Sequence, residues 1–305
     1  MYSLKRVLVA LDRSSHDEAL FAYISKLASL MDLDVVYFLH VANDLNLPDE
    51  ILAKYPDLVA PLDESIEKDI EYDIKKAQLP ENLRSEILIA EGNTVQEVLK
   101  TVKKKEIDLL VLGRKSNEEA NLQVVKKIVR SAPCSISIIP KFLPERLNKI
   151  LVPVDFSENS LMSLQQAEVF SSKFPDLKVE SLHIFDVPSG YSKIGKTYEE
   201  FSVIMEQNAR NQFDAFLKKH PLNLPNLVCH FERLDQQHVP SLIFQFSVAN
   251  NVDAIILGSR GRDSFSNFIM GSVAEGLIDK DQYWPLIVLK SKTDHFGIGE
   301  ALMGI

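Results

Sequence analysis

The hydrophobic positions of this chain form short continuous runs, separated by longer segments in which apolar residues recur at helical spacing. In the second half the runs are rich in Val, Ile and Leu and lie at 149–154, 179–185, 227–234, 254–257 and 286–289. Continuous runs of this kind predict strands that are buried on both faces of a sheet. The segments between them predict amphipathic helices at 160–172, 198–218 and 240–250.

The first half shows the same alternation, with helices predicted at 15–31, 63–76, 94–105 and 119–130. Strands that alternate with helices predict a parallel sheet with right-handed crossovers and helices on both faces. In such sheets, ligands bind beyond the carboxyl ends of the strands, where the strand order reverses. The residues at the predicted strand ends are therefore the site candidates: Asp12, Val41 and Gly113 in the first half, and Asp155, Ile184 and Gly258 in the second.

Three segments recur at nearly constant spacing, which identifies the chain as a tandem duplication. KRVLVALDRS at 5–14 matches NKILVPVDFS at 148–157, and FLHV at 38–41 matches SLHI at 181–184, both at an offset of 143 positions. IDLLVLG at 107–113 matches VDAIILG at 252–258 at an offset of 145. A stretch with two prolines at 140–147 discourages continuous secondary structure between the copies. We therefore predict domains at 1–143 and 147–291, followed by a C-terminal tail at 292–305.

A glycine-rich segment follows the fourth predicted strand of the second copy. Gly258 and Gly261 bracket a tight turn in which no side chain blocks approach to the backbone. Gly271 and Ser272 then open a predicted helix, whose free N–H groups and positive dipole end suit an anion. The Ser272 hydroxyl can cap this helix or donate to a phosphate oxygen. The segment also carries two cations, Arg260 and Arg262.

The complete spacing of this segment is more informative than any one of its glycines, each of which alone is typical of an ordinary turn or cap. Gly-x2-Gly-x9-Gly-Ser after a buried strand, with VPVD ending at Asp155, resembles the ATP-binding branch of the universal stress protein family. The resemblance covers 3–140 and 147–291, and it implies that Asp155 contacts adenosine and that Ile184 flanks the adenine. The nucleotide-binding residues that it implies are Pro153, Val154, Asp155, Ile184, Gly258, Arg260, Gly261, Arg262, Gly271, Ser272 and Val273.

The first copy departs from this pattern after its fourth predicted strand. Ser116 stands where the second glycine is expected, and Asn121 and Leu122 replace the Gly-Ser pair. The loop is also five residues shorter, because 22 positions separate Gly113 from Ser135 against 27 in the second copy. The first copy is therefore predicted to be a structural half.

The charges of the shortened loop support the same prediction. Glu118 and Glu119 would repel a phosphate group, and the Arg114-Lys115 pair is interpreted as a solvated turn. His40 and His183, at matching strand ends, are interpreted as framework residues rather than catalytic ones.

Composition narrows the class of protein. The chain has 305 residues, about twice the ~150 residues of a typical domain. A formal net charge of −9 argues against a nucleic-acid partner, and the absence of an apolar run of about 18 residues argues against a membrane span or signal peptide. Two cysteines, 95 positions apart, offer neither a disulfide framework nor a Cys-based zinc site. We therefore expect a cytoplasmic protein.

Fold and resemblance together predict an α/β protein of two tandem, doubly wound, Rossmann-like domains, each with a five-stranded parallel sheet, forming an internal pseudo-dimer. The predicted ligand is ATP, with or without Mg²⁺.

No nucleophile, general base or metal site accompanies the glycine segment, so a regulatory protein with a protein partner of undefined identity is favoured over an enzyme. Three alternatives stay open: slow ATP hydrolysis, adenylation on the same scaffold, and a nucleotide-free interaction scaffold. A homodimer of whole chains is the lesser alternative to the pseudo-dimer.

Adenylation is disfavoured by the loop after the first strand of the second copy. Enzymes of the related ATP-pyrophosphatase type carry Ser-Gly-Gly-x-Asp-Ser there, whereas this chain reads DFSENS at 155–160.

Overall fold

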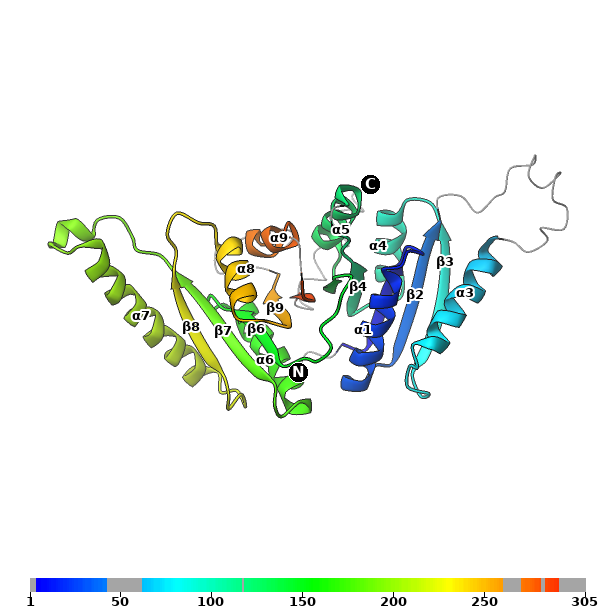
Figure 1. Cartoon of the computed structure of the whole chain (residues 1–305), viewed down its shortest axis with the longest axis horizontal. Helices are drawn as coiled ribbons and strands as arrows, with labels where there is room; N and C mark the ends of the chain where they lie inside the picture. The colour runs from blue at the N-terminus through cyan, green and yellow to red at the C-terminus, as the bar shows by residue number, and fades with distance from the viewer. Residues whose placement is uncertain (1–3, 43–61, 117, 260–269, 281–282, 291–305) are drawn as a thin grey trace. The chain divides into compact units, whose positions relative to one another are not determined.

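The computed structural model describes residues 4–42, 62–116, 118–259, 270–280 and 283–290. The chain divides between Leu143 and Pro144 into two compact units, here called unit 1 and unit 2. Each unit is an α/β layer structure with a five-stranded parallel sheet (Figure 1). The predicted α/β class with two Rossmann-like units in tandem is confirmed.

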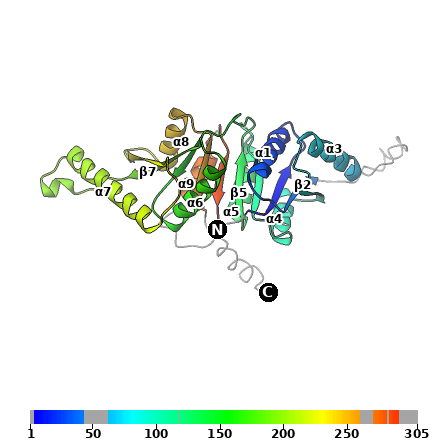
Figure 2. The ribbon, with the colours of Figure 1, turned by 90° about the horizontal axis from the view of Figure 1, so that it is seen from below.

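Unit 1 has the strand order β3-β2-β1-β4-β5, with every neighbouring pair parallel. The strands are β1 (Arg6–Leu11), β2 (Val35–Ala42), β3 (Arg84–Glu91), β4 (Leu109–Gly113) and β5 (Ser135–Ile139). The helices are α1 (Asp17–Leu30), α3 (Leu62–Lys76), α4 (Thr94–Lys104) and α5 (Glu119–Ser131). Helices α1 and α3 cover one face of the sheet and α4 and α5 the other, as right-handed crossovers require (Figure 2).

Unit 2 repeats this arrangement with the order β10-β9-β6-β7-β8, again parallel throughout. The strands are β6 (Lys149–Pro153), β7 (Lys178–Phe185), β8 (Val228–Arg233), β9 (Ala254–Gly258) and β10 (Leu286–Leu289). The helices are α6 (Glu158–Lys173), the 3₁₀ turn η1 (Tyr191–Ile194), α7 (Tyr198–Lys219), α8 (Val239–Ala249) and α9 (Ser272–Ile278).

The central strands form the core of each sheet, as the continuous apolar runs predict. Val7, Leu8 and Val9 of β1 are fully buried, and all four residues of β10 are buried. One expectation is wrong: the run at 227–234 is not buried on both faces. It forms β8, the last strand of its sheet among the described residues, and Val228, at the start of this edge strand, is 52% exposed.

The strand order reverses between β1 and β4 in unit 1, and between β6 and β9 in unit 2. The carboxyl ends of these strands are the position at which doubly wound sheets bind ligands. Both candidate aspartates follow the first strand of each pair, and both glycines, Gly113 and Gly258, end the second. Among the described helices, none is long and apolar enough to cross a membrane.

Candidate functional site

The loop after β6 fixes the carboxylate of Asp155. Its Oδ1 accepts hydrogen bonds from the Ser157 backbone N–H (3.1 Å) and from the Ser160 hydroxyl (2.6 Å). The Asp155 N–H in turn donates to the Ser160 hydroxyl (3.0 Å), and Ser157 caps α6 through the Ser160 N–H (3.3 Å). The carboxylate is thereby held beyond the end of β6 by the first turn of the next helix.

An aromatic cluster supports this loop from the β7 side. Phe156 has a positive φ of 65° and stacks on His183 at a ring-centroid distance of 4.3 Å. Phe213 and Phe216 of α7 pack against the Phe156 ring, at 6.2 and 5.9 Å. His183 donates from Nδ1 to the Val154 carbonyl (2.9 Å), which joins the ends of β6 and β7. This bond gives His183 the framework role that the sequence predicts.

The glycine at the end of β9 has a packing role that sequence reasoning did not predict. A Cβ on Gly258 would lie 2.4 Å from Cβ of Asn159 in α6, and one on Gly113 would lie 2.9 Å from Cδ2 of His16, just before α1. Both glycines allow a helix to approach the neighbouring strand. The contact with Asn159 is enough to explain a glycine at position 258, without a ligand that approaches its backbone. The remaining residues of the segment therefore carry the argument for binding.

The two described ends of the glycine-rich segment lie together. Ser259 donates its N–H to the Leu289 carbonyl (2.8 Å) and accepts a hydrogen bond from the Gly271 N–H (2.7 Å). Gly271 is the N-cap residue of α9, and Ser272 is the first helical residue and is exposed. Of the two roles expected for the Ser272 hydroxyl, capping is therefore not the one that this helix uses. Arg260, Gly261 and Arg262 lie outside the described residues.

Sequence reasoning missed Ser259. The residue is only 2% exposed, and its hydroxyl makes no hydrogen bond with any described residue. A buried hydroxyl without a partner is costly and calls for an explanation. Its place directly after Gly258, inside the recognised spacing, was the signal that could have identified it.

The structure brings five of the predicted residues of unit 2 to one edge of the sheet. Strand β6 pairs with β7 on one side and with β9 on the other. Because parallel strands end at the same edge, the residues at these three carboxyl ends belong to one locality. Those residues are Pro153, Val154, Asp155, Ile184 and Gly258, while Val273 follows Ser272 in α9.

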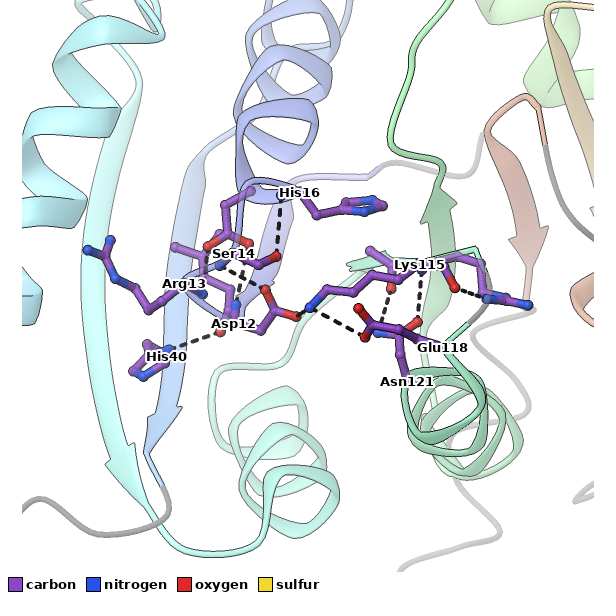
Figure 3. Close-up of polar contacts among 12 residues, drawn as sticks. Asp12, Arg13, Ser14, His16, His40, Lys115, Glu118 and Asn121 are labelled. Atoms are coloured by element: carbon purple, nitrogen blue, oxygen red, sulfur yellow. Dashed lines mark hydrogen bonds and ion pairs between the residues drawn. The ribbon is translucent and has the colours of Figure 1, made fainter.

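The corresponding edge of unit 1 is occupied by a lysine. The Lys115 ammonium lies 2.6 Å from Oδ2 of Asp12 and 3.7 Å from Oε2 of Glu118 (Figure 3). Asn121 accepts a hydrogen bond from the Lys115 N–H (2.9 Å) and donates to the Gly113 carbonyl (3.3 Å). The shortened loop is therefore folded back onto the ends of β1 and β4.

The interpretation of Arg114-Lys115 as a solvated turn is consequently wrong. Arg114 is 6% exposed and the Lys115 side chain 21%. The physical reason is that Arg114 continues the strand: its N–H donates to the Ile139 carbonyl at the end of β5 (2.9 Å).

Burial and charge set the protonation of this group. Burial alone would raise the pKa of Asp12, but hydrogen bonds from Lys115 and Ser14, together with the Lys115 charge, outweigh it and lower the pKa. Burial alone would lower the pKa of Lys115, and Asp12 reverses this to a raised value. Asp17, behind Asp12, has its pKa raised to about 6 by burial and then by the Asp12 charge. Among the described residues, no cluster of three His, Cys, Asp or Glu could hold a metal ion.

Comparison with known proteins agrees with this architecture. A sequence model of the universal stress protein family matches residues 3–140 and 146–281. A universal stress protein of Methanocaldococcus jannaschii is 25% identical over 159 residues, which are 47% of this chain and 95% of that protein.

Two solved structures show the same fold along nearly the whole chain. One is a universal stress protein from Archaeoglobus fulgidus, with 16% identity, a TM-score of 0.62, and coverage of 95% of this chain and 97% of that one. The other is a protein of unknown function from Pseudomonas aeruginosa, with 14% identity, a TM-score of 0.64, and coverage of 96% and 95%.

Proposed function

This chain belongs to the universal stress protein family, and we propose that its second unit binds one adenine nucleotide, ATP, at the carboxyl ends of β6, β7 and β9. The observation that carries the proposal is the Gly-x9-Gly-Ser part of the segment, at 261–272, together with the 2.7 Å hydrogen bond that joins Gly271 to Ser259. The adenosine-contacting position that the family resemblance implies, Asp155, follows the strand next to β9.

The described residues fit the phosphate end of such a ligand. Ser259 offers a buried hydroxyl that no described residue uses, and a phosphate oxygen would accept its hydrogen bond. Ser272 is exposed beside Gly271, where its hydroxyl can donate in the same way. In this proposal Arg260 and Arg262 supply positive charge to an otherwise acidic protein.

The described residues also fit the nucleoside end. Asp155 presents a carboxylate whose position is fixed by Ser157 and Ser160, and a carboxylate accepts hydrogen bonds from ribose hydroxyls. Ile184, half-buried near the end of β7, offers an apolar surface for a planar base.

ATP would act here as a regulatory ligand. Its phosphates bring charge to the segment between β9 and α9, so nucleotide occupancy would change the surface that a protein partner meets. Slow hydrolysis at the same site is the alternative function, and a scaffold that never binds nucleotide is the other. The two alternatives predict different results for the purified chain: a hydrolytic protein would release ADP, and a scaffold would carry no nucleotide.

The first experiment is mass spectrometry of the denatured, freshly purified chain, which should release an adenine nucleotide. Thermal unfolding with added ATP, with and without Mg²⁺, should show a melting temperature that rises with the logarithm of ATP excess. Release of ADP over hours would identify the hydrolytic alternative. No released nucleotide together with no thermal shift would identify the scaffold and refute the proposal.

Ser259→Ala separates ligand binding from stability. Because the hydroxyl has no partner among the described residues, the free protein should keep its stability, whereas ATP affinity should fall about 10-fold, as for a lost hydrogen bond to a charged group. Ser181→Ala is the matched control, since Ser181 is buried within β7 and its hydroxyl likewise has no hydrogen-bond partner in the part of the chain that the structure describes. Equal ATP affinity in both variants would remove Ser259 from the proposed site.

A further inference from the structure

The Lys115 ammonium pairs with two carboxylates at the strand ends of unit 1, as a bound cation would. Its ammonium reaches from the loop after β4 to the carboxylate of Asp12 at the end of β1, and Glu118 flanks it from the start of α5 (Figure 3). The Asn121 amide, bonded to both Lys115 and Gly113, fixes the backbone from which the side chain extends. The lysine is thus directed at Asp12 by its surroundings.

One carboxylate near Lys115 is replaced by a hydroxyl in unit 2. The residue of unit 2 that matches Lys115, Arg260, belongs to the longer loop that lies outside the described residues. Asp17 accepts hydrogen bonds from the backbone N–H groups of Asp12 (3.3 Å) and Arg13 (2.9 Å). At the matching position of unit 2, Ser160 accepts the Asp155 N–H and donates to the Asp155 carboxylate. Unit 1 therefore places a third carboxylate, Asp17, beside Asp12 and Glu118, the two carboxylates with which Lys115 forms ion pairs.

We propose that Lys115 is an internal counter-ion that fills the ligand position of unit 1 and thereby confines nucleotide binding to unit 2. This inference rests on the proposed function for its ligand class, a nucleoside. Asp12 occupies in unit 1 the position that Asp155 occupies in unit 2, so a ribose hydroxyl and the Lys115 ammonium would compete for one carboxylate.

Tethering makes this competition favourable to the lysine. A group linked to its partner through a short loop acts at an effective concentration of the order of millimolar. If the ion pair is open about 1% of the time, the apparent Kd of a ligand that needs Asp12 is raised about 100-fold. The phosphate groups of a nucleotide would add no affinity in this unit. Glu118 and Glu119 would repel them, and Ser116 and Asn121 stand where unit 2 has glycines.

The test is the number of adenosine sites per chain in the full-length protein. Lys115→Met keeps the apolar stem and removes the charge, and Lys100→Met is the matched control, because Lys100 is 69% exposed and pairs with Glu97 in its own helix. Equilibrium dialysis with radiolabelled adenosine should find one more site per chain in Lys115→Met than in the wild type. ATP should bind this additional site at least 10-fold more weakly than it binds the site of unit 2. Lys100→Met should match the wild type.

An unchanged site number in folded Lys115→Met would overturn the inference. Because the count is taken relative to the wild type, the proposed function is judged separately: a wild-type chain with no site would refute nucleotide binding by unit 2 without deciding the role of Lys115.

A second measurement needs no substitution of Lys115. A limiting dose of an amine-acylating ester, followed by peptide mass spectrometry, should modify Lys115 at least 10-fold more slowly than Lys100. Asp12→Asn should increase the Lys115 rate at least 3-fold and leave Lys100 unchanged. Equal rates at the two lysines in the wild type would show that Lys115 is not held and would overturn the inference.

Discussion

The two units share a backbone at the strand ends and differ in the chemistry placed on it. His40 donates from Nδ1 to the Leu11 carbonyl (3.1 Å), as His183 does to that of Val154 (2.9 Å). The residue after each aspartate, Arg13 or Phe156, has a positive φ of 61° or 65°. A likeness in fold therefore extends to the loop backbone in both halves, and it does not by itself decide which half binds a ligand.

The side chains on that shared backbone diverge. Arg13 forms ion pairs with Asp69 and Asp73 of α3, at 2.6 and 3.6 Å. Phe156, at the same position, instead stacks on His183. Among the described residues, the strand ends of unit 1 are therefore paired with charged side chains, whereas the hydroxyl of Ser160 contacts the aspartate of unit 2 and aromatic rings pack beside it. The lesson is that the two copies share the backbone geometry of their strand ends while the side-chain chemistry placed on it differs.

The glycines that end β4 and β9 give the largest expected effect on stability. An added Cβ at Gly258 would meet Cβ and backbone atoms of Asn159, at 2.4 to 3.1 Å, whereas at Gly113 it would meet only the side-chain ring of His16. We expect Gly258→Ala to cost about 3 kcal/mol of unfolding free energy and Gly113→Ala about 1 kcal/mol, within the range for overpacked cores.

Urea unfolding of both variants measures this difference. Equal losses, or a larger loss at Gly113, would show that the two helix approaches are not organised as the contacts indicate.

The second prediction concerns pH and the Asp17–Ser160 difference. Asp17 has a folded pKa of about 6, above its ordinary value of 3.8, chiefly because it is buried. Its contribution to stability is therefore fully present below pH 3.8 and is lost as the pH rises through 6. A shift of this size corresponds to at most about 3 kcal/mol.

Asp17→Ser, which installs the residue of unit 2, removes this titration. The variant should gain stability relative to the wild type as the pH rises from 4 to 7, because only the wild type loses the Asp17 contribution. The difference between the two unfolding free energies should level off above that range. The comparison is made by urea unfolding at each pH, with Asp34→Ser, an exposed surface change, as the control. A flat difference across this range would mean that Asp17 ionises at its ordinary pKa.

Much of the fold could be predicted from the sequence because buried parallel strands leave an unambiguous pattern. The runs that became β6, β7, β9 and β10 and the helices between them follow directly from apolar spacing. Strand β8 shows the limit of the method, since an apolar run does not reveal that its strand lies last in the sheet. The pairing of the final strands of the two halves as an internal pseudo-dimer stays a prediction.

The site could be predicted only where spacing carries meaning. Asp155, Ile184 and Gly271 follow from the duplicated landmarks and the glycine segment. The position of the Lys115 ammonium could not be predicted, because its contact with Asp12 joins residues more than 100 positions apart through a shortened loop. The packing role of Gly258 was hidden for the same reason, since the neighbour that requires it, Asn159, belongs to another element.

The most direct test of the difference between the units is calorimetric titration of the full chain with ATP, compared with Gly271→Arg. Gly271 has an extended backbone (φ −65°, ψ 144°) that other residues adopt readily, so the variant should fold while its side chain fills the proposed phosphate position. We predict one ATP per wild-type chain and none in the variant. Two equivalent sites in the wild type, or an unchanged site in Gly271→Arg, would contradict the account.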